Sequence, residues 1–103
     1  MTHPNCTPSY DMRTVCDAAK KAAERNTEWT THPASRVHGV RGRANHKIVE
    51  FRVTFGGGTY RYYLSSAGVL FSCTSDGFIP IELATYDASQ LNTIRRVLDT
   101  IAT

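Results

Sequence analysis

The residues of this chain that are best suited to bind a ligand are basic, and they gather in one stretch without acids. No aspartate or glutamate occurs between Glu28 and Glu50, and these 21 residues hold four basic side chains and three histidines. The formal charge of the chain is +3, so this stretch carries +4 and the remainder carries −1. Cationic groups concentrated in this way are typical of surfaces that bind phosphates or acidic proteins.

A second group of basic and aromatic residues follows this stretch directly. The expected strand pairing places Arg52 opposite Tyr63 and Thr54 opposite Arg61 on the outward face of a sheet. Arg52 and Tyr63 could form a cation–π pair, or a cross-strand pair that only stabilises the sheet. The predicted binding residues are Arg36, Arg41, Arg43, Lys47, Arg52, Arg61, Tyr63 and Trp29.

Motifs of catalysis and cofactor binding are missing from the sequence. It contains no P-loop, no G-x-S-x-G, no H-E-x-x-H and no C-x-x-C. The three glycines at 56–58 join two strands, which indicates a hairpin turn rather than a phosphate cradle. His3 and Cys6 with His32 or His38 offer zinc ligands, but their spacing matches no regular zinc pattern. We predict no catalytic residues, no metal and no cofactor.

The cysteines and the N-terminal residues indicate a reducing compartment. Three cysteines are too few for a disulfide framework, and Cys16 and Cys73 fall on faces that we expect to be buried. The first residues lack the pattern of a signal peptide, and no apolar run reaches the roughly 20 residues of a membrane span. We therefore predict a cytoplasmic protein without a membrane partner.

Apolar periodicity predicts a helix near each end of the chain. Residues 1–8 show no periodicity and are expected to form a flexible tail, whereas residues 9–25 carry apolar side chains three and four positions apart. Residues 87–102 repeat this spacing, and Asp87 with Gln90 forms a capping-box pattern. Residues 27–45 are predicted to be irregular, with a short strand considered at 36–41.

Four strands are predicted between the helices because apolar and polar residues alternate from residue 47 onward. Turns are expected at residues 57–58, 66–67 and 75–77. Pro80 cannot donate a ladder hydrogen bond, so the fourth strand should lie at an edge. The turns would pair Phe55 with Tyr60, Leu64 with Val69, and Cys73 with Ile79.

These elements predict a two-layer α+β fold. It consists of an N-terminal helix, a four-stranded antiparallel meander and a C-terminal helix, with both helices on one sheet face and the other face in water. The domain would span residues 9–103, with residues 27–45 as an irregular basic segment. An apolar fraction of 41% and a charged fraction of 20% exclude a disordered chain.

Charge placement favours a small non-catalytic binding protein. The first hypothesis is a protein that docks a nucleic acid or a nucleoprotein complex through the basic segment and sheet face. The alternative is a protein-binding inhibitor or adaptor of the phage or mobile-element type, such as an antagonist of a host nuclease or defence complex, with Trp29, Phe78 and Tyr86 as anchors. An enzyme with an unrecognised site and a homodimer stay open as further alternatives.

Overall fold

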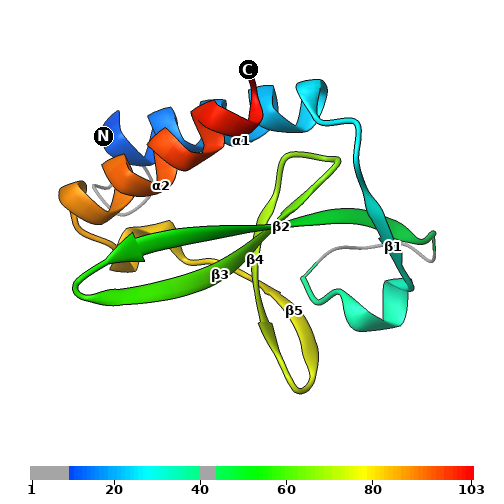
Figure 1. Ribbon diagram of the computed structural model, residues 1–103. Coiled ribbons are helices and arrows are strands. Elements are labelled where there is room, and N and C mark those ends of the chain that lie inside the picture. The colour runs from blue at the N-terminus through cyan, green and yellow to red at the C-terminus, as the bar shows by residue number, and fades with distance from the viewer. Residues whose placement is uncertain (1–9, 40–43) are drawn as a thin grey trace, which may run out of the picture.

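The computed structural model describes residues 10–39 and 44–103, which form a two-layer α+β domain (Figure 1). In this described part, two α-helices, α1 (Tyr10–Arg25) and α2 (Ala88–Ile101), lie side by side over one face of an antiparallel sheet. The predicted fold class is confirmed. No helix in these two ranges is long and apolar enough to cross a membrane.

The sheet has five strands within the described ranges, one more than predicted. The extra strand is the first one, and it lies in the segment that was predicted to be irregular. Its threonines are β-branched, and Pro33 favours an extended backbone at His32. The strands, which pair in chain order, are β1 (Thr30–His32), β2 (His46–Phe55), β3 (Gly58–Ser65), β4 (Leu70–Thr74) and β5 (Gly77–Pro80).

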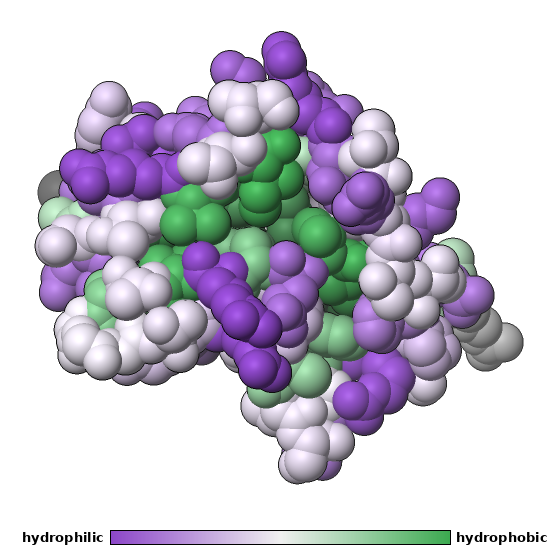
Figure 2. Space-filling model, in the orientation of Figure 1, coloured by the Kyte–Doolittle hydropathy of each residue, from purple (hydrophilic) through white to green (hydrophobic). Residues whose placement is uncertain are grey.

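The helices pack on the sheet through stripes set by local spacing. α2 buries three residues of its predicted stripe, and its capping box is confirmed. The backbone N–H of Gln90 donates to Asp87 Oδ1 (2.8 Å), and the N–H of Asp87 donates to Gln90 Oε1 (3.0 Å). Apolar residues remain visible along the seam between α2 and β2 (Figure 2). Cys16, predicted to be buried, lies outside the alanine-rich face of α1 and is exposed.

The β2–β3 hairpin has the predicted faces but a different register. Its turn is Gly56-Gly57, and both residues have positive φ angles (62° and 79°). Phe55 therefore pairs with Gly58 rather than with Tyr60. Three consecutive glycines permit either turn, and the two turns differ by two residues in register. A shift of two keeps every side chain on its predicted face.

The two later hairpins differ from prediction by one residue, which changes the face of the side chains in β4 and β5. The β3–β4 loop has three residues and ends at Gly68, whose positive φ (83°) suits a bulge. Phe71 consequently pairs with Tyr63 and not with Tyr62. In the next hairpin Cys73 pairs with Phe78 rather than with Ile79, and Cys73 is exposed.

This shift builds a second core on the sheet face that was expected to be in water. Val37, Ile48, Phe71 and Phe78 are all buried there, and Tyr63 packs against them. Val37 forms a parallel bridge with Phe78, and the neighbouring His38 N–H donates to the Phe78 carbonyl (2.8 Å). β5 is the last strand of the sheet, as Pro80 indicated, but the chain after β1 covers part of its edge.

Candidate functional site

The predicted basic residues are spread over the molecule. Arg41 and Arg43 lie outside the described residues. Arg36 is exposed in a short 3-10 helix (Ala34–Arg36), where its Nη1 donates to the Ser75 carbonyl (3.4 Å) at the β4–β5 turn. Lys47 is exposed at the start of β2, in the part of that strand that pairs with β1. These side chains therefore belong to different parts of the surface.

Three predicted residues do share one face of the sheet, the face turned away from the helices. Arg52 lies directly opposite Arg61, and Tyr63 lies opposite Glu50. The predicted pairing of Arg52 with Tyr63 is wrong because the β2–β3 register differs by two residues. The Tyr63 hydroxyl donates to Glu50 Oε1 (3.2 Å), and Arg52 Nε lies 3.8 Å from Glu50 Oε2.

On this face, the positive charges of Arg52 and Arg61 are only partly balanced by a carboxylate. Like charges directly opposite each other destabilise a sheet, and Glu50 lies within ion-pair distance of Arg52. Among the residues that the structure describes, Arg61 makes no ion pair. Burial, and then the hydrogen bond to Glu50, raises the pKa of Tyr63, so its hydroxyl stays a donor. The charge available to a ligand on this face is centred on Arg61.

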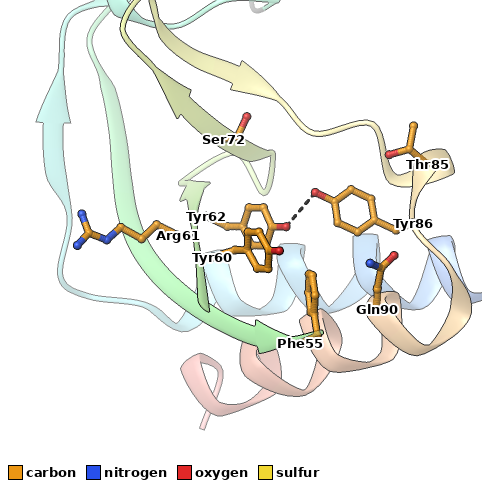
Figure 3. A pocket seen from close by; sticks show the side chains of 8 residues that line it. All are labelled: Phe55, Tyr60, Arg61, Tyr62, Ser72, Thr85, Tyr86 and Gln90. Atoms are coloured by element: carbon orange, nitrogen blue, oxygen red, sulfur yellow. Dashed lines mark hydrogen bonds between the residues drawn. The ribbon is translucent and has the colours of Figure 1, made fainter. Parts of the chain in front are cut away.

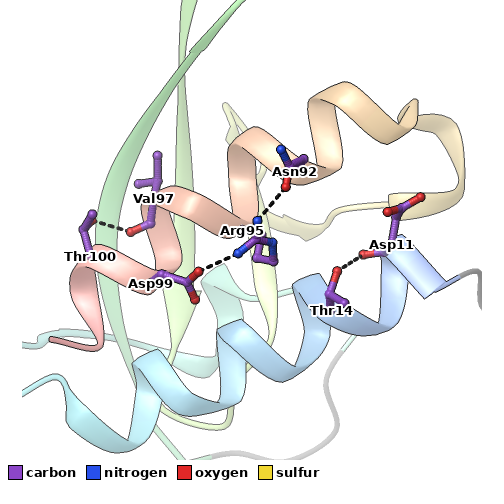
Figure 4. Close-up of polar contacts among 7 residues, drawn as sticks. All are labelled: Asp11, Thr14, Asn92, Arg95, Val97, Asp99 and Thr100. Carbon is purple, nitrogen blue, oxygen red and sulfur yellow. Dashed lines mark hydrogen bonds and ion pairs between the residues drawn. The ribbon is translucent and has the colours of Figure 1, made fainter.

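On the helix layer, the polar contacts of Arg95 on α2 lie within its own helix. Its Nη1 donates to Asp99 Oδ2 (2.8 Å), and its Nη2 donates to Asn92 Oδ1 (2.6 Å) (Figure 4). An ion pair one helical turn apart satisfies both groups locally. Arg95 is therefore engaged within its own helix.

The three aromatic residues expected as anchors take part in packing. Trp29 is partly buried against the core under the helices, and its Nε1 donates to the Asn26 carbonyl (3.2 Å). Phe78 lies in the second core and is only 4% exposed. Tyr86 is partly buried and shares a hydrogen bond with Tyr62. Trp29 packs on the opposite side of the sheet from Arg52 and Arg61.

The histidines in the described ranges make structural contacts. The His32 ring packs edge-on against Phe78, with ring centroids 4.7 Å apart. His38 Nε2 lies 2.8 Å from the Asp76 carbonyl, to which it can donate. Residues 10–39 and 44–103 contain no cluster of three His, Cys, Asp or Glu side chains that could hold a metal ion. His3 and Cys6 fall outside these ranges.

A pocket that the sequence did not reveal opens between the two halves of the sheet. It has a volume of about 440 Å³ and is lined from β2, β3, β4 and the segment that enters α2 (Figure 3). Phe55 and Tyr60 stack with their centroids 5.1 Å apart, and the hydroxyls of Tyr62 and Tyr86 are 2.9 Å apart. Burial, and then the bond to Tyr86, raises the pKa of Tyr62 above its ordinary value. The pocket therefore has an aromatic wall and a pair of hydrogen-bonded hydroxyls.

The pocket lies where β3 parts from β4. Their ladder ends at the pair Tyr63–Phe71, but β3 continues to Gly58 and β4 continues to Thr74 in pairing with β5 alone. Figure 1 shows the β2–β3 hairpin and the β4–β5 hairpin diverging from this point. In the described chain, β3 therefore has no strand partner along residues 58–62 on the side away from β2. We call this stretch the open edge.

The backbone of the open edge alternates in direction. The N–H of Ser65 donates to the Val69 carbonyl (2.9 Å), so Ser65 directs its backbone groups away from β2. Every second residue of a strand shares that direction, which places the N–H and C=O of Arg61 and Thr59 along the open edge. Side chains alternate as well: Tyr60 and Tyr62 point into the pocket, whereas the side chain of Arg61, which also borders the pocket, extends away from the tyrosine rings (Figure 3).

Comparisons with protein families, with curated proteins and with solved structures give no match for this chain.

Proposed function

We propose that this chain is a small non-catalytic binding protein that pairs an extended segment of a partner protein with the open edge of β3. The observation that carries the proposal is the early end of the β3–β4 ladder at Tyr63–Phe71. An unpaired strand edge offers backbone donors and acceptors to any extended chain, and added strands are a recurrent mode of peptide recognition. Such a protein would act as an adaptor or inhibitor of its partner.

The residue types along the open edge support this function. Natural edges are commonly blunted by charged side chains, above all lysine, or by proline; residues 58–62 contain neither lysine nor proline, and Arg61 is their one charge. Tyrosine and arginine are enriched where binding energy is concentrated, and Tyr60, Arg61 and Tyr62 occupy three consecutive positions. Tyr60 is 48% exposed, so a large aromatic surface borders the edge.

The experiment is affinity capture from the source cell, with and without nuclease, using a backbone variant. Thr59→Pro removes an outward N–H while leaving Arg61 and both pocket tyrosines in place. Thr59→Val keeps the N–H and the preference for an extended backbone. We expect a nuclease-resistant protein partner that Thr59→Val retains and Thr59→Pro loses. Equal capture by both variants would contradict strand pairing.

A nucleic acid is the second candidate because Arg52 and Arg61 lie directly opposite each other. A phosphate between two guanidinium groups would relieve their repulsion. Glu50 beside Arg52 and the separation of Arg36 and Lys47 make this surface less suited to a polyanion than the sequence suggested. Binding of a labelled oligonucleotide at about 50 mM salt, lost in an Arg52→Gln/Arg61→Gln variant, would support it. Equal binding by that variant would exclude this face.

A further inference from the structure

The two sides of the open edge differ in chemistry, and this difference specifies the partner. We infer, on the basis of the proposed function, that the bound segment is a strand in which acidic residues alternate with apolar or aromatic residues. The acidic side chains would lie beside Arg61, with Arg52 one strand further away on β2, and the apolar ones would enter the pocket beside Tyr60 and Tyr62. This pattern follows from the alternation of side chains along β3.

The first step is the geometry of an added strand. Successive side chains of a strand point to opposite faces, and residues on neighbouring strands share a face with their lateral neighbours. A segment paired with residues 58–62 would therefore place every second side chain on the arginine face. The intervening side chains would lie on the pocket face with Tyr60 and Tyr62.

The second step is the charge on the arginine face. Arg61 makes no ion pair with any described residue, and Arg52 has only the 3.8 Å contact with Glu50, where both side chains are substantially exposed. Glu50 also accepts a hydrogen bond from Tyr63. A carboxylate placed next to Arg61 can accept two N–H bonds from one guanidinium. An acidic residue at this position would balance a charge that the protein itself leaves unbalanced.

The third step is the chemistry of the pocket face. The stacked rings of Phe55 and Tyr60 form one side, and the Tyr62–Tyr86 hydroxyl pair occupies the interior. Because two hydroxyls share one hydrogen bond, one of their protons is still available to a ligand. A volume of about 440 Å³ accommodates a large side chain. We assign this side to a large apolar or aromatic residue, which gains burial and ring contacts there.

The test uses synthetic peptides of about six residues, the length that covers residues 58–62. One peptide alternates glutamate with phenylalanine and valine. A second peptide has the same composition, but its glutamates and its apolar residues are grouped in two blocks. A shift of one residue along the edge restores the correct facing of an alternating peptide, whereas no shift separates the two residue types of a block peptide onto opposite faces. A third alternates lysine with the same apolar residues. Fluorescence anisotropy of labelled peptides measures binding to the full chain.

We expect the alternating glutamate peptide to bind about tenfold more tightly than either control, the ratio that one charged hydrogen bond supplies. Arg61→Glu should reverse the preference toward the lysine peptide. Arg96→Glu makes the same change of net charge at an exposed site on α2 and should leave the preference unaltered. Equal binding of the glutamate and lysine peptides, with loss of both in Thr59→Pro, would overturn this inference and leave strand pairing standing.

Three further outcomes would also contradict this inference. If no alternating peptide binds and Thr59→Pro captures the same partner as Thr59→Val, strand pairing itself fails along with the inference. If sedimentation shows a dimer of the full chain that Thr59→Pro dissociates, the occupant of the open edge is a second copy. An oligonucleotide that displaces the glutamate peptide would instead assign the arginine face to phosphates.

Discussion

The edge of β5 and the open edge of β3 belong to the same sheet, but the residues that the structure describes cover only the former. At β5, Val37 forms a bridge with Phe78, and the side chain of Arg36 reaches the β4–β5 turn. At β3, the neighbouring strand diverges after Tyr63 and leaves a pocket in place of a ladder. The β4–β5 hairpin contributes Phe71 and Phe78 to the second core, and its divergence from β3 leaves the open edge.

The largest difference between the two regions should appear when aromatic side chains are truncated. Phe71 is fully buried in the second core, so Phe71→Ala should lower the free energy of unfolding by about 4 kcal/mol. Tyr60 at the open edge is half exposed, so Tyr60→Ala should cost only about 1 kcal/mol. Urea unfolding measures both values. Comparable losses would mean that the open edge is as important to stability as the core.

A smaller but still large effect is expected from the glycines at the two hairpin turns. A Cβ at Gly77 would lie 2.3 Å from the Arg36 carbonyl oxygen, and its φ is 125°. Gly77→Ala should therefore destabilise the fold by about 3 kcal/mol. Gly57 has φ 79° and nothing within 4 Å of such a Cβ, so Gly57→Ala should cost about 1 kcal/mol. Thermal unfolding would contradict this comparison if the two variants melted together.

The pocket should give the fold a dependence on alkaline pH. The pKa of Tyr62 is raised in the folded state. Its contribution to the stability of the fold is therefore fully present below about pH 10, the pKa of a tyrosine phenol in the unfolded chain. Above that pH the unfolded chain ionises first, and stability falls as pH rises. The melting temperature should therefore drop more steeply in the wild type than in Tyr62→Phe. Parallel curves would show that Tyr62 does not drive the loss.

The smallest effect is expected for proline at an outward position of the open edge. Thr59 directs its N–H away from β2, so Thr59→Pro should cost no more than about 1 kcal/mol in the free protein. Tyr60 pairs with Val53 and directs its N–H toward β2, so Tyr60→Pro should cost about 3 kcal/mol. Circular dichroism with urea titration separates the two. If Thr59→Pro cost more stability than Tyr60→Pro, the backbone groups without a strand partner would be those of Tyr60 and not those of Thr59.

The local features of this chain could be predicted from sequence, and the non-local ones could not. The capping box of Asp87 and Gln90 and the faces of β2 and β3 depend on neighbouring residues only, and both are as predicted. The position of Phe71 depends on one residue in the β3–β4 loop, where Gly68 permits a bulge. A shift of one residue was enough to move Phe71 from the expected core to the second one.

The candidate site was predictable only in part for the same reason. Alternation placed Arg52, Arg61 and Tyr63 on one face, but their mutual contacts depended on which two of three glycines form the turn. The open edge depends on the early end of the β3–β4 ladder at Tyr63–Phe71, which no local pattern in the sequence indicates. The aromatic spacing of Tyr60 and Tyr62 was the one signal in the sequence for the pocket; Tyr62 is buried in the core under the helices, whereas Tyr60 is 48% exposed.

The bridge between Val37 and Phe78 also has a consequence for the order of folding. Closing a long loop costs entropy before its contacts form, whereas the β2–β3 hairpin closes around two glycines. The hairpin and its packing against the helices can therefore form early, and the second core is completed late. Changes at Val37 should then accelerate unfolding and leave the folding rate nearly constant. We therefore expect the contact between Val37 and β5 to be the last to form and the first to be released.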